Sequence, residues 1–147
     1  MTVVLSSPPF YTTYIQLATG ETMAPEIIRN TKFFPYFAHA IGAIDGSHIH
    51  ISPLSHLRPN YRNHKGFVSQ NCLFVCGFDM KFSYTLTGWE GSATDARIYQ
   101  DAISTDLHIP QGKYLLGDAG FPLRLGLLVP YQGVHYHLAE WGRANLR

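Results

Sequence analysis

The chain has 147 residues, a length that predicts a single domain. Its formal net charge is +1 and 46% of its residues are hydrophobic, which excludes a disordered chain and gives no overall field for a polyanion. No apolar run approaches the ~18 residues of a membrane span, and the first residues lack the pattern of a signal peptide, so we expect an intracellular protein without a membrane partner.

Residues 1–40 predict an irregular lead-in to the main domain, which we expect over residues 41–147. Ser, Pro and Gly interrupt this lead-in, and Pro25 can open one short helix. An aromatic cluster then surrounds Pro35: Phe33, Phe34, Tyr36 and Phe37. We expect this cluster to cover the core as a lid, with a partner surface as the alternative.

The stretch from Ala43 to Ile51 predicts a short buried strand with Asp45 in its middle. A buried carboxylate costs free energy unless it is paired, hydrogen-bonded or bound to metal. Asp45 is therefore the first candidate functional residue. The alternative is a turn formed with Gly46, because Asp-Gly is a common turn dipeptide.

A basic loop follows this strand. Arg58, Arg62 and Lys65 alternate there with Tyr61, His64 and polar residues. Such a loop can hold phosphates by charge and stack on bases through its aromatic ring. By itself such a loop is more often solvated and without a ligand, and binding of nucleic acid is the alternative.

Residues 68–87 predict an antiparallel hairpin, because apolar side chains alternate along both arms around a turn at Asp79-Met80. Cys72 and Cys76 lie four residues apart on the first arm. At about 3.3 Å per residue their Cα atoms would be roughly 13 Å apart, too far for a disulfide. We expect two reduced core thiols.

A helix is predicted next, with Ser92 or Thr94 as its N-cap and Asp95 in its first turn. The helix dipole favours a carboxylate there by roughly 0.3–1 kcal/mol, which is a sufficient structural reason for Asp95. A short buried strand over residues 113–117 then ends at Asp118. The end of a buried strand is a common place for a functional group in α/β proteins, and a turn carboxylate is the alternative.

The chain resembles the Harbinger-type DDE transposase nucleases, including the Harbinger-derived nuclease of animals. Four motifs carry the resemblance in the family's order: residues 42–49 (GAIDGSHI), 61–67 (YRNHKGF), 88–97 (GWEGSATDAR) and 116–122 (LGDAGFP). It covers about residue 25 to the C-terminus. It implies an α/β, RNase H-like mixed sheet with flanking helices.

The resemblance also implies a divalent-metal nuclease acting on DNA in the nucleus, with a separate DNA-binding partner protein as a further expectation. Asp45 and Asp118 would be the catalytic acids, and Asp95 an accessory metal ligand beside them. Mg²⁺ or Mn²⁺ would be the cofactor, since such ions prefer oxygen ligands. Arg58, Arg62 and Lys65 would contact DNA.

One departure from the family pattern concerns the family's final Glu. The family's final Glu lies on a helix well downstream of the Asp118 motif, and Glu140 is too close to Asp118 to match it. We therefore expect a domain incomplete at its C-terminus, with impaired cleavage. The alternative is a non-catalytic transposase relic that binds DNA or a protein.

A histidine-ligated zinc protein is a third possibility. His48 and His50 lie on one side of a predicted strand, as do His135 and His137 on another. Pairs of this kind are compatible with Zn²⁺, although they often serve as polar-face residues.

Overall fold

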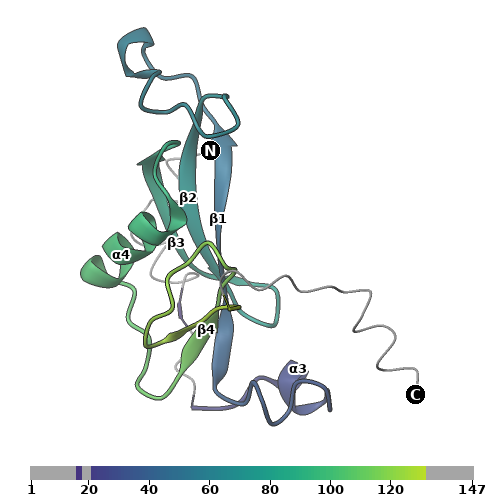
Figure 1. Ribbon diagram of the computed structural model, residues 1–147. Helices are drawn as coiled ribbons and strands as arrows, with labels where there is room; N and C mark the ends of the chain where they lie inside the picture. Colours follow the sequence, from purple (N-terminus) through teal and green to yellow (C-terminus); the bar gives the residue numbers. More distant parts are fainter. Residues whose placement is uncertain (1–15, 18–20, 132–147) are drawn as a thin grey trace, which may run out of the picture.

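The computed structural model describes residues 16–17 and 21–131, and its centre is a five-stranded mixed sheet (Figure 1). The elements in chain order are α3 (Pro25–Ile28), β1 (Ala40–His50), the 3-10 turn η1 (Ser55–Leu57), β2 (Ser69–Cys76), β3 (Phe82–Glu90), α4 (Asp95–Thr105), β4 (Tyr114–Leu116) and β5 (Leu127–Leu128). None of the helices in these ranges has the length and apolar character needed to cross a membrane.

The strand order in the sheet is β3-β2-β1-β4-β5. β2 pairs antiparallel with both β3 and β1, whereas β4 runs parallel to β1 and β5 runs parallel to β4. Helix α4 connects the hairpin to β4. This arrangement confirms the predicted α/β, RNase H-like class, because that fold also places a three-stranded meander beside parallel strands.

The hairpin and the helix form for the reasons that their sequences indicate. Met80 adopts a left-handed conformation (φ 64°) at the predicted turn, and the Gly77 N–H donates to the Lys81 carbonyl at 2.8 Å. At the start of α4 the N-cap is Thr94, not Ser92, since its hydroxyl accepts from the Arg97 N–H. The capping position of a helix is worth about 1 kcal/mol.

The core lies between the sheet and α4. Ile44, Leu73 and Val75 face Ile98 and Tyr99 of the helix, and all five are at most 3% exposed. Helix α4 covers this side of the sheet in Figure 1. We call it the helix face.

The other side of β1 carries Ala43, Asp45, Ser47 and Ile49, all of which are exposed. Phe74 of β2 lies opposite Asp45 in the antiparallel register and is half-buried. We call this side the open face. It corrects one prediction: β1 has eleven residues, and Asp45 is exposed rather than buried.

The aromatic lid predicted around Pro35 is also wrong. Phe33 and Phe34 are each 45% exposed and Tyr36 is 78% exposed, so these rings do not cover the core. The prediction of two reduced thiols is confirmed: Cys72 and Cys76 are both free, the first buried and the second half-buried.

Candidate metal and nucleic-acid site

Asp45 lies within β1, and Asp118 lies two residues after the end of β4, the strand that pairs with β1 in parallel. Ala43 of β1 pairs with Leu116 of β4, and each aspartate follows its paired residue by two positions. A side chain at the intervening Gly117 would meet the Ile44 Cγ2 atom at 3.4 Å, which places position 117 toward the helix face. Asp118 is exposed and follows Leu116 by two positions, as the exposed Asp45 follows Ala43.

Both carboxylates are exposed, and each is fixed by a short local bond. The Asp45 Oδ1 atom accepts the Gly46 N–H at 2.8 Å. The Asp118 Oδ1 atom accepts the Gly120 N–H at 2.9 Å, which closes the turn after β4. The turn that sequence reasoning offered as an alternative for Asp118 therefore exists alongside its place at the end of the strand.

Asp95 is on the opposite side of the sheet. A Cβ atom at Gly46 would lie 2.0 Å from the Asp95 Oδ1 atom, and Gly46 points toward the helix face. The Asn71 side chain donates to the same oxygen at 2.8 Å. Asp95 thus approaches β1 from the face opposite to that of Asp45, and the contacts of Asp95 are those of a residue that fixes the start of α4.

Asn71 was not singled out by the sequence analysis. Its side chain is 1% exposed, and its amide donates to Asp95 and to the Ala93 carbonyl at 3.0 Å. Its Oδ1 atom has no hydrogen-bond partner among the described residues. The available signal was an amide at an inward position of an otherwise apolar strand, since buried amides are usually bonded to a specific partner.

The basic loop between β1 and β2 extends beyond one end of the sheet (Figure 1). Arg58, Arg62 and Lys65 are all exposed on it. The Arg62 guanidinium donates to the Gly66 carbonyl, so its position is set within the loop. The three cations give this loop a local positive charge.

Asn63 organises this loop from within. It is 4% exposed, its Oδ1 atom accepts the N–H groups of Lys65 (3.0 Å) and Phe67 (3.3 Å), and its amide donates to the Ser69 hydroxyl at 3.2 Å. The same hydroxyl lies 3.0 Å from the His48 Nδ1 atom. This chain of polar contacts connects the basic loop to β2 and β1.

The histidines of β1 make contacts within this region. His48 lies edge-on to His64 with ring centroids 6.0 Å apart, and His50 stacks on Phe67 at 4.4 Å. The described residues contain no group of three or more histidine, cysteine, aspartate or glutamate side chains placed to hold one metal ion. His135 and His137, the other predicted pair, lie outside the described residues.

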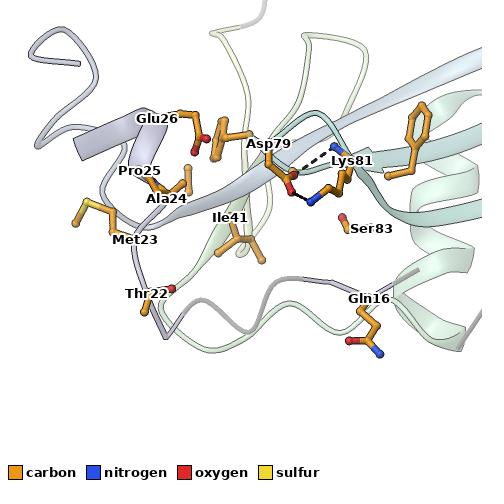
Figure 2. A pocket seen from close by; sticks show the side chains of 14 residues that line it. Gln16, Thr22, Met23, Ala24, Pro25, Glu26, Ile41, Asp79, Lys81 and Ser83 are labelled. Carbon is orange, nitrogen blue, oxygen red and sulfur yellow. Dashed lines mark hydrogen bonds and ion pairs between the residues drawn. The ribbon is translucent and has the colours of Figure 1, made fainter. Parts of the chain in front are cut away.

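A hollow of about 470 Å³ lies elsewhere, between the segment around α3 and the turn of the hairpin (Figure 2). Its wall combines apolar side chains such as Ile41 with Glu26 and the ion pair of Asp79 and Lys81, which are 3.0 Å apart. The Lys81 ammonium and N–H lower the pKa of the exposed Asp79 carboxyl. The candidate aspartates do not line this hollow.

Comparison with known proteins places these features in context. Residues 44–146 match the family model described as DDE superfamily endonuclease. The chain is 37% identical to "Putative nuclease HARBI1" of Rattus norvegicus and 34% identical to the human protein of the same name, over 93 residues in each case. Each alignment covers 61% of this chain and 27% of the relative, so the matched segment is about a quarter of those proteins. No solved structure matches.

Proposed function

Because the chain belongs to the DDE superfamily endonuclease family, and so confirms the resemblance of its four motifs, we propose that it forms part of a divalent-metal-dependent nuclease or transposase acting on DNA. The observation that carries this proposal is that Asp45 and Asp118, both exposed, each follow by two positions a residue of the paired parallel strands β1 and β4. Two exposed carboxylates so placed can converge on one ligand.

The donor set fits Mg²⁺ or Mn²⁺. Mg²⁺ takes oxygen ligands, keeps several waters, and is commonly bound through one or two carboxylates together with substrate phosphates. Asp45 and Asp118 would hold the ion, and their exposure leaves room for waters and a phosphate. When bound, the ion would polarise the phosphate and lower the pKa of the attacking water or hydroxyl.

We propose that the protein itself contributes placement and charge. The pairing of β1 with β4 would bring Asp45 and Asp118 near each other, and their bonds to Gly46 and Gly120 limit the rotation of each carboxylate. Asp95 is proposed to act on the site only indirectly, through Gly46, because its carboxylate lies on the helix face.

Arg58, Arg62 and Lys65 are proposed to contact the phosphates of DNA beside this site. Cations on a loop positioned by a rigid sheet are suited to orient a duplex without reading its sequence. Replacing Arg58 and Lys65 by Gln should weaken binding of any duplex and reduce the slope of log affinity against log salt by about 2.

We propose that cleavage by the 147-residue chain is weak. Within residues 16–17 and 21–131, Asp45 and Asp118 have no third potential ligand grouped with them, whereas the two-metal mechanism of phosphodiester cleavage requires several carboxylates. Metal-dependent nicking of plasmid DNA at a rate typical of a nuclease, lost in Asp45→Asn, would contradict this part of the proposal.

The deciding experiment is a Mn²⁺ titration of the whole chain, in which binding is measured by the enhancement of the relaxation rate of water protons. We expect saturable binding that is lost in the variant Asp45→Asn, Asp118→Asn and retained in the control Asp79→Asn, Glu90→Gln. Equal binding by all three proteins would mean that the two aspartates do not form the site.

A second candidate function is a non-catalytic DNA-binding module, favoured by the exposed basic loop. It predicts duplex binding in EDTA that disappears with the Arg58→Gln, Lys65→Gln variant and is unchanged in Asp45→Asn, Asp118→Asn. From the family alone, we further propose action in the nucleus together with a separate DNA-binding protein.

A further inference from the structure

The segment between α3 and β1 presents three large rings to solvent. Phe33, Phe34 and Tyr36 are 45%, 45% and 78% exposed, and they fall within four consecutive residues. Large apolar side chains exposed close together mark an interaction site more often than scattered single residues do.

The segment is held in place before any ligand arrives. The Phe33 and Phe34 N–H groups both donate to the Asn30 carbonyl at 2.9 Å, and the Phe37 N–H donates to the Phe33 carbonyl at 2.9 Å. The Tyr114 hydroxyl donates to the Tyr36 carbonyl at 3.1 Å, which ties the segment to β4. A fixed backbone lowers the entropy that must be lost when the rings bind something.

The charge of the segment points to an anionic ligand. Residues 27–39 contain Arg29 and Lys32, both exposed, and no Asp or Glu. Neither cation has an ion-pair partner in the part of the chain that the structure describes. The nearest acidic residue in sequence, Glu26, lines the hollow with Asp79 and Lys81 instead (Figure 2).

Exposed rings beside cations match the chemistry of unpaired nucleotides. Single-stranded nucleic acid offers phosphates to the cations and base faces to the rings, and such stacking tolerates any sequence. The bases of a duplex are already stacked on one another, so the same rings would gain little from intact double-stranded DNA.

The segment also lies at the starts of both strands that carry the candidate aspartates. It leads directly into β1, and Tyr114 is the first residue of β4. From Ala40 to Asp45 is five residues, or about 17 Å along a strand at 3.3 Å per residue. That length corresponds to about five stacked nucleotides at 3.4 Å each.

We propose that the aromatic segment, defined by Arg29, Lys32, Phe33, Phe34 and Tyr36, binds unpaired nucleotides of a DNA strand whose backbone passes the Asp45–Asp118 site. This inference rests on the proposed function for its choice of DNA as the ligand. The DNA strand would then contact the protein at the aromatic segment as well as at the Asp45–Asp118 site, and the aromatic segment lies at the opposite end of β1 from the basic loop.

The test is fluorescence anisotropy of a labelled 15-nucleotide oligothymidine, measured in EDTA so that no metal site contributes. We expect Phe33→Leu, Phe34→Leu, Tyr36→Leu to weaken binding about tenfold or more, because leucine keeps apolar bulk but removes the ring faces on which bases stack. A blunt duplex of the same length should lose much less affinity.

Two further variants control this experiment. Tyr131→Leu changes a tyrosine that is also 78% exposed but lies outside the segment, and it should bind like the wild type. Arg29→Gln, Lys32→Gln should weaken binding and lower its salt dependence. Circular dichroism and urea unfolding of every variant exclude loss of the fold as the cause.

Three outcomes would overturn the inference. The triple leucine variant could bind oligothymidine like the wild type, or it could lose duplex and single-strand affinity equally, which would mean contact with phosphates only. Sedimentation could instead show a dimer that the triple variant abolishes, which would make a second copy the ligand of these rings.

The result is separable from that of the proposed function. The variant Asp45→Asn, Asp118→Asn should lose Mn²⁺ and keep oligothymidine binding in EDTA. A wild-type chain that binds oligothymidine through the aromatic segment but does not bind Mn²⁺ would contradict the nuclease proposal alone. Mn²⁺ binding that depends on Asp45 and Asp118, together with unchanged oligothymidine binding by the triple leucine variant, would contradict only the aromatic segment.

Discussion

At the scale of single residues, the two neighbours Asp45 and Gly46 face opposite sides of the sheet and meet different surroundings. Asp45 is exposed on the open face, whereas Gly46 sits against the Asp95 carboxylate, which Asn71 holds in place. Glycine is required here by close approach, since any Cβ atom would overlap Asp95 Oδ1.

We expect Gly46→Ala to lower the free energy of unfolding by about 1–3 kcal/mol, the usual cost of overpacking a filled site. Urea unfolding would measure it. Ser47→Ala, on the exposed neighbouring position, is the control and should stay within about 0.5 kcal/mol of the wild type. An alanine at position 46 that leaves stability unchanged would show that Asp95 moves aside easily.

At the scale of elements, side-chain bonds fix α4 to β3. The Trp89 indole N–H donates to the Asp101 carboxylate at 3.1 Å, and the Arg97 guanidinium lies 5.5 Å from the centre of the Trp89 ring. The Tyr84 hydroxyl donates to Asp106 at 2.6 Å, just beyond the end of the helix. Each contact therefore joins the hairpin to a different turn of α4.

Trp89→Phe should destabilise the fold by about 1–2 kcal/mol, because it removes the bond to a carboxylate and weakens the contact with Arg97. A double-mutant cycle with Asp101→Asn would measure the coupling energy between the two side chains. We expect the double variant to lose less stability than the sum of the losses in the two single variants. Strict additivity would mean that this hydrogen bond contributes nothing to the attachment of α4.

The loop between β1 and β2 depends on Asn63 in the same way. Asn63→Ala removes three hydrogen bonds around a buried side chain, and we expect it to loosen the loop and cost about 1–3 kcal/mol of stability. Trypsin should then cut at the loop cations faster than in the wild type. Asn60→Ala, in the exposed part of the loop, is the control, and equal cleavage of both variants would refute the role of Asn63.

Local patterns were sufficient to predict most elements, but not which surfaces other elements cover. Alternation predicted the hairpin, and a hydroxyl before a periodic segment predicted α4. The residues around Asp45 are mostly apolar and therefore predict a strand buried on both sides, yet α4 covers only one side of β1. The exposure of Phe33 and Phe34 could not be predicted either, because it depends on whether a distant segment reaches them.

The candidate site was partly predictable for a related reason. The resemblance to the transposase nucleases predicts that Asp45 and Asp118 converge, and the local pattern adds only that Asp118 follows a buried strand. The same resemblance predicts Asp95 as an accessory metal ligand, whereas the local pattern explains Asp95 as a carboxylate in the first turn of a helix. Only the path of the chain across the sheet decides that this helix lies on the side away from Asp45.

At the scale of the whole molecule, stability should depend on high pH through two buried groups. Burial raises the pKa of the Cys72 thiol above its ordinary 9.0 and that of the Tyr99 phenol above 10.0, and the Gly88 N–H and the Arg124 charge oppose these shifts only in part. The folded state therefore keeps both protons at a pH where the unfolded chain releases them.

The free energy of unfolding should be constant with respect to these groups below pH 9 and fall above it, first through Cys72 and then, above pH 10, through Tyr99. Urea unfolding from pH 8 to 10.5 would measure the fall. In Tyr99→Phe the part above pH 10 should become smaller, and the remainder should come from Tyr114, whose pKa is also raised by burial. This variant should also be no less stable at pH 7, because the buried Tyr99 hydroxyl has no hydrogen-bond partner among the described residues.

The close fit between Gly46 and Asp95 has a further consequence, which concerns how the strands find their alignment during folding. A slip of β1 by one residue exchanges its two faces. Asp45 would then occupy the place of Gly46, where its side chain would collide with Asp95 and two like charges would meet. The fit thus penalises the misaligned sheet more than the correct one, and a glycine and an aspartate side by side specify a single alignment of the central strand.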